Sequence, residues 1–404
     1  MDEPSRTSSD PKRDGIRLVA AMCFLVLGIL LPWIVERTPE VLERVYDPSV
    51  FRPIARVLAR IGDAVPFSIA QFWVLAFLVI VVVLLVRSVG RVRRTGRSAW
   101  LSVLGTWVVL ATVVIWSFHL VWGLQYGRTP FRERTGLPDV EVTTDRLAHL
   151  TRVLAEETNH SYRMAVEMGE IADPDAAPRA MSDGDRDTRE AGAREAGARE
   201  PGSLGIDRQR ILAALEAGYP KVLPDTRDLV TSRPKFPEPA GWLLTRLGIS
   251  GIYFPFTGEA SVNGRMPDVS IPFVAAHEMA HQKGIAREDE ANAIAYLACR
   301  SAGLWATRYS GALSAYRRAW SALYRSDPDS ARALQPSVVL DAGPEADRRA
   351  IQAFWQRHEG AATHIATQAN DTYLKANAQR AGVQSYGRMI DILVALDDLG
   401  MIGN

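Results

Sequence analysis

Three long apolar segments occupy much of the chain before residue 128. They span residues 16–35, 66–86 and 98–124; the first contains one charged residue, at its edge, and the other two contain none. Each is long enough to cross a hydrocarbon core of about 30 Å as a helix. The pattern therefore predicts that residues 1–127 form a membrane anchor with three transmembrane helices in a lipid bilayer.

From residue 128 onward the apolar positions recur mainly at helical spacing. Helical patterns cover residues 143–169, 206–219, 304–325, 328–335, 346–377 and 385–398. One segment differs: residues 250–264 are rich in β-branched and aromatic side chains between Gly and Pro, which predicts one or two short strands. The expected fold class is mainly α, with three transmembrane helices followed by a largely helical domain, residues 128–404.

Residues 172–203 interrupt this domain with a change of composition. The segment is charged and rich in Gly and Ala, it repeats AGARE, and it has almost no large apolar side chain. Such a segment buries too little surface to offset the entropy cost of ordering it. We therefore expect a disordered insertion that the domain does not need for folding.

The distribution of Arg predicts how the chain crosses the membrane. Residues 87–97 hold five Arg in eleven residues and no acid, whereas residues 36–65 hold five Arg beside five acids. Cytoplasmic loops are enriched in Lys and Arg. We therefore expect the 87–97 loop in the cytoplasm and residues 128–404 outside it, with the amphipathic segment 50–61 lying flat on the outer membrane surface.

Overall charge and cysteine content add little to this picture. The net charge is +1, so nothing indicates a nucleic-acid partner. Cys23 lies in the first apolar segment and Cys299 on a predicted buried helix face, which makes a disulfide between them implausible. Both are expected to be small packing residues.

The chemically informative motif is His277-Glu278-Met279-Ala280-His281, an HExxH pattern. On a helix the two His lie one turn apart on the same face, where they can hold one Zn²⁺. Glu278 adjoins the first His and can take a proton from a water held by the metal. The pattern predicts a catalytic zinc site with His277 and His281 as ligands and Glu278 as general base.

A third zinc ligand must come from outside this turn. Gly284 is placed to end the helix, and a second helix is expected from Glu288 onward. Glu288 and Asn292 share a face of that helix, so Glu288 can complete a His-His-Glu set while Asn292 hydrogen-bonds a ligand His. Glu290 points away from Glu288 and is the reserve candidate.

HEMAH followed by E-x-x-A-N resembles the gluzincin metallopeptidases, in which a Glu on a following helix is the third ligand. This resemblance implies His277, His281 and Glu288 as zinc ligands and Glu278 as base. The seven-residue step from His281 to Glu288 is shorter than in most gluzincins. Arg287 stands where a metzincin has its third His, which excludes that class.

The whole layout resembles a bacterial membrane family, the domain of unknown function 3810. The matching segments are SGIYFPFTGEASVN at 250–263, IPFVAAHEMAHQKGIAREDEAN at 271–292, YSG at 309–311 and NDTYLKANAQRAGVQSYGRMIDILV at 370–394. The resemblance implies a zinc peptidase anchored in the bacterial plasma membrane and supplies no substrate.

Peptide hydrolysis also needs a donor for the tetrahedral oxyanion and a surface for the substrate. Tyr309 is the first choice as donor, because YSG follows the ligand helix, with Tyr253, Tyr316 and Tyr373 as alternatives. In gluzincins a strand edge beside the zinc binds substrate backbone, a role that would fall to residues 260–263 here.

The sequence thus predicts a membrane-anchored zinc metallopeptidase with a peptide or protein substrate. The alternative is a catalytically inactive membrane-attached binding or scaffold protein that retains a structural metal site. A third interpretation is a chance HExxH on a packed helix. Intramembrane proteolysis is disfavoured, because Lys283 and residues 287–290 place five charges beside the motif, which would be costly in hydrocarbon.

Overall fold

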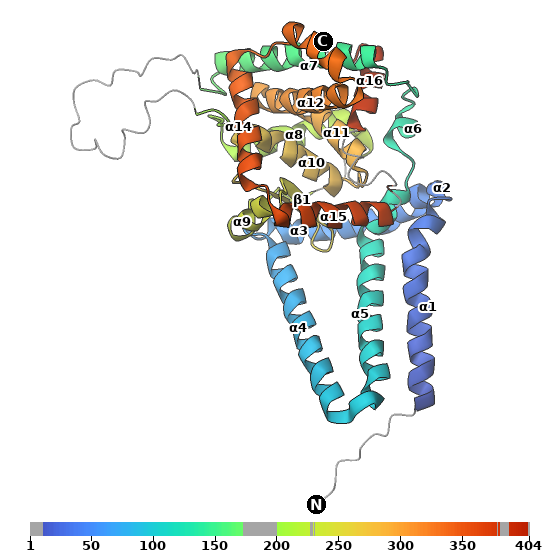
Figure 1. The fold of residues 1–404 in the computed structure, drawn as a ribbon. Helices are drawn as coiled ribbons and strands as arrows, with labels where there is room; N and C mark the ends of the chain where they lie inside the picture. The colour runs from blue at the N-terminus through green and yellow to red at the C-terminus, as the bar shows by residue number, and fades with distance from the viewer. Residues whose placement is uncertain are drawn as a thin grey trace, which may run out of the picture.

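The computed structural model describes residues 11–172, 200–226, 229, 231–377, 379 and 388–402. A layer of long helices stands beneath a helical domain, with both strands near their junction (Figure 1). The chain is 76% helical, with two strands in the part that the structure describes, which confirms the predicted fold class.

Three helices in the described part of the chain are long and apolar enough to span a membrane: α1 (Pro11–Val35), α4 (Ile69–Thr95) and α5 (Trp100–Val121). α1 packs along α5, and Trp116 Nε1 donates a hydrogen bond to the Phe24 carbonyl at 3.0 Å. α4 runs beyond the predicted end of its span, through most of the Arg-rich segment. The helix continues through this segment because Arg is a good helix former. It ends at Gly96, whose φ of 64° is typical of a helix C-terminus.

Short helices join these spans to the domain. They are α2 (Pro39–Val41), the π-helical η1 (Leu42–Phe51), α3 (Arg52–Asp63), η2 (Gly96–Ala99), η3 (Gly123–Gly127) and α6 (Phe131–Thr135). α3 runs across the upper ends of the spans, nearly at right angles to them (Figure 1), and the placement of segment 50–61 on the outer membrane surface stays a prediction.

In the described part of the domain, the α-helices after α6 are α7 (Thr144–Glu167), α8 (Arg208–Val222), α9 (Glu238–Arg246), α10 (Ile271–Gln282), α11 (Glu288–Ser301), α12 (Trp305–Ser326), α13 (Pro328–Leu334), α14 (Ala342–His358), α15 (Ala361–Ala376) and α16 (Met389–Asp398). Single turns of 3₁₀-helix lie at η4 (Pro224–Thr226), η5 (Asp268–Ser270) and η6 (Gln335–Ser337). The predicted helix 346–377 is divided in two because the backbone is extended at Glu359 and Gly360.

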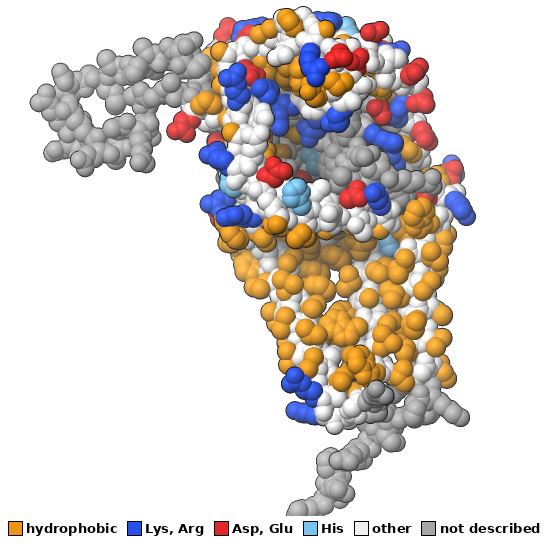
Figure 2. Space-filling model, viewed as in Figure 1, with side chains coloured by type: hydrophobic (Ala, Val, Ile, Leu, Met, Phe, Trp, Pro, Cys, Tyr) orange, Lys and Arg blue, Asp and Glu red, His pale blue; other side chains and the backbone are white. Residues whose placement is uncertain are grey.

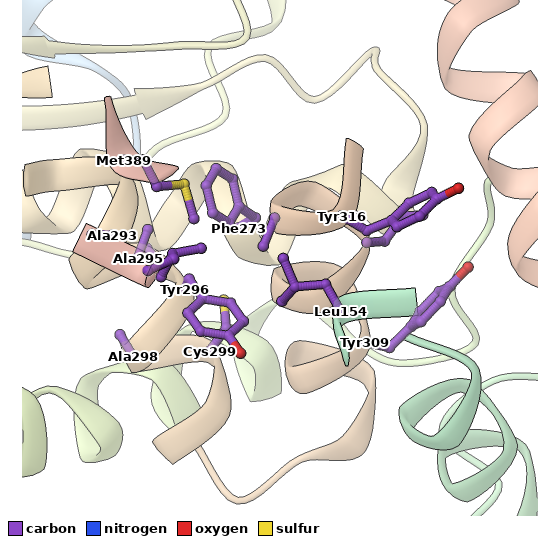
Figure 3. Close-up of a cluster of buried hydrophobic side chains, with 14 of the residues drawn as sticks. Leu154, Phe273, Ala293, Ala295, Tyr296, Ala298, Cys299, Tyr309, Tyr316 and Met389 are labelled. Carbon is purple, nitrogen blue, oxygen red and sulfur yellow. The ribbon is translucent and has the colours of Figure 1, made fainter. Parts of the chain in front are cut away.

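The core of the domain lies around α11, which packs against α8, α10 and α12. Small side chains on α11, such as Ala293 and Ala298, allow this close approach, and Tyr296 and Cys299 fill the space beside them (Figure 3). α10 is thereby held on several sides, which fixes the orientation of the residues it carries.

The two strands form an antiparallel hairpin, β1 (Gly251–Phe254) and β2 (Glu259–Val262), which confirms the predicted strands. This hairpin is attached to the membrane helix α4. The buried Glu259 carboxylate accepts hydrogen bonds from the backbone N–H groups of Ile69 at 3.1 Å and Ala70 at 2.7 Å. Trp73 of α4 stacks on Phe256, with ring centroids 4.7 Å apart. A span therefore holds the hairpin in place.

Most of the predicted insertion, residues 173–199, lies outside the described residues. Its C-terminal end does not. The Gly202 N–H donates to buried Asp347 Oδ1 at 2.6 Å, and a Cβ at Gly202 would approach Pro267 to 3.0 Å. Gly202 thus packs on the domain, although it lies inside the predicted insertion 172–203.

Candidate metal centre

α10 places the two His of the HExxH motif on one face, and the following turn brings Glu288 to them. α10 ends before Gly284, whose φ of 85° reverses the chain, and α11 begins at Glu288 itself. His277 Nε2 lies 3.1 Å from His281 Nε2 and 3.1 Å from Glu288 Oε2. The distance from His281 Nε2 to Glu288 Oε2 is 3.7 Å. The structure thus brings the predicted ligands His277, His281 and Glu288 together.

These distances fit a zinc ion. Ligand atoms about 2.0–2.1 Å from a tetrahedral Zn²⁺ lie about 3.3 Å from one another. A buried group of two imidazole nitrogens and one carboxylate oxygen is also the donor set of catalytic zinc sites. The His281 Nδ1 lies 2.7 Å from the Ile285 carbonyl, which accepts its proton and leaves Nε2 free to bind a metal.

Glu290, the reserve ligand, lies elsewhere. Its Oε1 accepts the backbone N–H of Phe131 at 2.8 Å and is 3.3 Å from the Arg287 Nε. The carboxylates of Glu288 and Glu290 thus have separate tasks: one faces the His pair and the other ties α11 to the start of α6.

The electrostatics of the site favour a bound cation. Burial opposes ionisation of Glu288, but His281 and His277 overcome it and hold its pKa well below the usual range. Burial also disfavours a charged His281, yet the nearby Glu288 and Glu278 raise its pKa to about 9. A group of carboxylates that stabilises positive charge on an imidazole will also stabilise a divalent ion.

Glu278 lies beside the ligands and against strand β1. Burial raises the pKa of Glu278 to about 8, with Glu288 adding to the rise and His281 and the Tyr253 N–H opposing it. A Cβ at Gly251 would come within 2.5 Å of Glu278 Oε1, so the missing side chain makes room for this carboxylate. A buried carboxylate of raised basicity is suited to accept a proton near neutral pH.

The strand edge beside the site belongs to β1. The sequence-based prediction assigned this edge to residues 260–263, and the structure does not place it there. β2 is fully buried, pairs with β1 and bridges to Lys235 on its other side, so it has no free edge. Along an antiparallel strand, residues whose backbone groups bond the partner strand alternate with residues whose groups point away from it. The Asn263 N–H donates to the Ser250 carbonyl, and this bond fixes which residues of β1 are of each kind. The backbone groups of Gly251 and Tyr253 therefore point away from β2, on the side that lines the cavity.

A cavity of about 710 Å³ surrounds the site. Its walls include β1 and the next two residues, the α10–α11 ligands, and the side of α15 that carries Thr367, Asn370 and Tyr373. The membrane anchor also contributes Phe118, Trp122 and Tyr126. The predicted division at residue 127 thus separates residues that share one cavity.

Tyr309, the predicted oxyanion donor, is not brought to this cavity. It is completely buried in the core near Leu154 (Figure 3), and its hydroxyl donates to Asp347 Oδ2 at 2.7 Å. Of the alternatives, Tyr253 and Tyr373 line the cavity, while Tyr316 is not among its lining residues. The YSG sequence therefore serves the packing of α12, whose small Ser310 and Gly311 lie against α10 and α11.

The residue that sequence reasoning missed is Arg318. It is the one Lys or Arg side chain among the described residues that line the cavity. Its guanidinium lies 4.7 Å from the centroid of Phe273, and its Nη2 donates to Asn292 Oδ1 at 3.3 Å. Asn292 was expected to orient a ligand His, but its amide donates to the Glu288 carbonyl and its oxygen holds Arg318.

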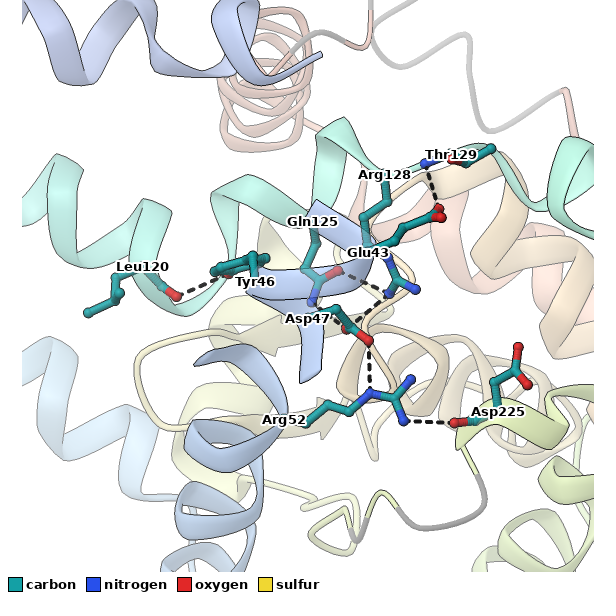
Figure 4. A network of polar contacts seen from close by, with 9 residues as sticks. All are labelled: Glu43, Tyr46, Asp47, Arg52, Leu120, Gln125, Arg128, Thr129 and Asp225. Carbon is teal, nitrogen blue, oxygen red and sulfur yellow. Dashed lines mark hydrogen bonds and ion pairs between the residues drawn. The ribbon is translucent and has the colours of Figure 1, made fainter. Parts of the chain in front are cut away.

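A polar network of the anchor supports the turn between the ligand helices (Figure 4). The buried Asp47 carboxylate lies 2.8 Å from the Arg52 Nε and 3.2 Å from the Arg128 Nη1, and it accepts from the Gln125 amide at 3.3 Å. Arg128, Gln125 and Phe51 lie against Gly284, where a Cβ would meet them at 2.9–3.5 Å. This contact fixes the turn whose next residue, Ile285, orients His281.

Comparison with known proteins gives a family without an activity. A family model described as "Protein of unknown function (DUF3810)" matches residues 46–394, so the chain belongs to this family. No curated protein and no solved structure matches the chain.

Proposed function

Starting from this membership in the DUF3810 family, we propose that the protein is a membrane-anchored zinc metallopeptidase. The observation that carries the proposal is the approach of His277 Nε2, His281 Nε2 and Glu288 Oε2 to within 3.1–3.7 Å of one another, beside the Glu278 carboxylate in a cavity. Zinc bound by these atoms would polarise the scissile carbonyl and make water a stronger nucleophile.

The residues of the chain supply the remaining chemistry. Glu278 takes the proton of the attacking water and returns it to the leaving amine. Arg318 supplies positive charge for the oxyanion of the tetrahedral state, and its bond to Asn292 fixes its direction. The Tyr253 N–H faces Glu278 and favours its charged form, which links the base to β1.

A polypeptide is the substrate class that this site fits best. An extended peptide can add to the edge of β1 through the Gly251 backbone and the Tyr253 carbonyl, because the Tyr253 N–H already faces Glu278. The aromatic side chains around that edge, Trp122, Phe254 and Phe256, offer apolar contact area for its side chains.

The scaffold alternative differs in its use of the metal. Structural zinc sites are closed by four protein ligands, whereas three ligands next to a cavity leave a position open. An inactive protein also has no need of a buried carboxylate at Glu278. These points favour the peptidase.

We place the protein in a bacterial plasma membrane, with the site outside the cytoplasm. The support is the position of Arg93 and Arg94 in the last turn of α4, at the end of the spans opposite to the site (Figure 1). Reporter fusions after residue 95 and at the C-terminus should report opposite sides, with residue 95 cytoplasmic. A cytoplasmic C-terminus would reverse this orientation.

The function is tested with the full-length protein in detergent. Wild type should hold one zinc per chain and cleave a mixture of quenched fluorescent peptides. His277→Ala and Glu288→Ala should lose the metal, whereas the control Glu290→Ala should keep it. Glu278→Gln should keep zinc and lose activity by about 10²–10⁴-fold, the usual contribution of a general base.

Two results would count against the proposal. Equal zinc in wild type and in the His277→Ala/His281→Ala variant would remove the metal site. Full zinc without cleavage of any peptide would favour the scaffold alternative.

A further inference from the structure

The cavity lies at the level where the membrane spans end. Phe118 belongs to the span α5 and Trp122 follows directly after it, and both line the cavity. The ring of Trp122 is 5.9 Å from that of His281 and 4.6 Å from that of Tyr253. The candidate metal ligands therefore lie about one side chain above the end of a membrane helix.

This distance places the site within the lipid headgroup layer. The hydrocarbon core is about 30 Å thick and the whole bilayer about 40–45 Å, which leaves about 5–8 Å of headgroups on each side. In Figure 2 the apolar surface over the spans continues to the level of α15, and charged side chains gather above it. The bilayer surface thus meets the protein close to the cavity.

Apolar side chains are exposed on β1 and α15, which line the cavity, and on α9 and α3, which lie near the level of α15 in Figure 1. These are Ile252 of β1, Trp242 and Leu243 of α9, Ile365 of α15, and Val57 and Ile61 of α3. The same helices carry positive charge that headgroups can pair with: Arg246 of α9 is exposed and Arg56 of α3 is half-buried. The protein surface beside the cavity is therefore interfacial.

The floor of the cavity also connects two spans that diverge. α4 and α5 are joined at their far ends and separate toward the domain (Figure 1). Phe118 and Trp122 extend the α5 side, and Phe254 and Phe256 pack on Trp73 of α4. A chain that emerges from the bilayer beside these helices meets the β1 edge after only a few residues.

We infer that the substrate is a polypeptide anchored in the same bilayer, cut within about six residues of the membrane surface. This inference rests on the proposed function and names its substrate class. Six extended residues reach about 20 Å, which spans the headgroup layer and the cavity. A folded soluble protein cannot bring a peptide bond so close to the hydrocarbon without partly unfolding.

The first test measures where the cavity lies. A fluorophore is attached at Ile252→Cys in full-length Cys23→Ser protein, reconstituted with lipids that carry a quencher on the headgroup. Val339→Cys, on an exposed loop of the domain before α14, is the matched control. We expect at least about threefold stronger quenching at residue 252. Equal quenching at both positions would show that the cavity stands clear of the bilayer and would overturn the inference.

The second test measures what the site accepts, with full-length protein in phosphatidylcholine/phosphatidylglycerol vesicles. The probe is a synthetic transmembrane helix followed by 20 randomised residues, so that sequence preference averages out. A matched probe carries ten prolines, about 31 Å of rigid spacer, between helix and randomised stretch. Both probes are concentrated equally at the membrane, so they differ only in distance from it.

We expect cuts mainly in the first six randomised residues of the first probe, and at least about tenfold slower cleavage of the spaced probe. Cuts spread evenly along the stretch, or equal rates for both probes, would overturn the inference and leave the peptidase intact. No cleavage of either probe, or of soluble peptides, by zinc-loaded protein would instead remove the proposed function and the inference with it.

Discussion

The membrane spans and the helices of the domain are built on opposite distributions of side chains. In α4, large residues such as Leu75 and Leu85 are more than half exposed, whereas α11 buries Ile294 and Tyr296 completely. The first pattern requires lipid and the second supplies its own core. The junction between them follows neither pattern: Trp122, at the end of a span, is 2% exposed and belongs to the cluster that packs under the site.

This difference teaches that the anchor is part of the site and not only a tether. Tyr46, Phe51, Trp122 and Tyr126 of the anchor form one buried cluster with Leu229 and Ala286 of the domain. Glu259 of the hairpin in turn binds the first N–H groups of α4. Four predictions test how far the two regions can be separated, beginning with the largest expected effect.

Removing the anchor should abolish the metal site. A fragment of residues 128–404 lacks the aromatic half of the junction cluster and the Asp47 network behind Gly284. We expect it to aggregate or to bind no stoichiometric zinc, which metal analysis after gel filtration will show. A monomeric fragment with one zinc and full peptidase activity would mean that the anchor only tethers the domain.

The contrast between spans and junction also explains what the sequence could reveal. Apolar length is a local property, so the three spans and the helical fold class were predictable, as were the hairpin and the spacing of the HExxH motif. The proximity of His281 to Trp122 is not local, since 158 residues of chain lie between them. No periodicity reports such a contact.

The errors at the site have the same cause. Tyr309 was selected by its place after the ligand helix, but the direction of a side chain on α12 depends on which neighbours α12 packs against. The same packing turns Arg318 toward Asn292 and into the cavity. Similarly, residues 260–263 and 251–254 both read as strand, and only the pairing with Lys235 decides which edge is covered.

The second prediction concerns Arg318, which belongs entirely to the domain. Arg318→Ala should lower kcat by about 10²–10³-fold, the usual loss for one oxyanion donor, and leave zinc content unchanged. Arg317→Ala is the matched control, because Arg317 neighbours it on α12 but lines a different cavity. Similar activity in both variants would remove Arg318 from the mechanism.

The third prediction concerns Asp47, which belongs entirely to the anchor. Asp47→Ala leaves Arg52 and Arg128 without their shared carboxylate and should destabilise the fold by about 3–5 kcal/mol. Because this network supports the turn that orients His281, zinc affinity should fall about tenfold. Competition with a zinc chelator measures this effect.

The control for Asp47 is Glu345→Ala, which removes a carboxylate from the solvent-accessible pairs with Arg348 and Arg349 in α14. Exposed pairs contribute at most about 1 kcal/mol, and this one is remote from the site, so zinc affinity should stay the same. If both variants weaken zinc binding equally, the effect comes from general destabilisation and not from the anchor.

The smallest effect is expected at Tyr309, where the sequence-based assignment and the structure disagree. Its hydroxyl bonds to Asp347, which also accepts the Gly202 N–H, so Tyr309→Phe removes a hydrogen bond to a buried carboxylate that keeps at least one other donor. We expect a loss of about 1–2 kcal/mol in unfolding free energy and less than a twofold change in kcat.

Tyr373→Phe, which alters a hydroxyl on a cavity wall, should lower kcat several-fold while costing less stability, because that side chain is partly exposed. Denaturant titration and peptide cleavage measured on the same preparations will separate the two. A hundredfold lower kcat for Tyr309→Phe with full zinc would show that Tyr309 takes part in catalysis. That result would contradict the packing of α12 that buries this side chain away from the cavity.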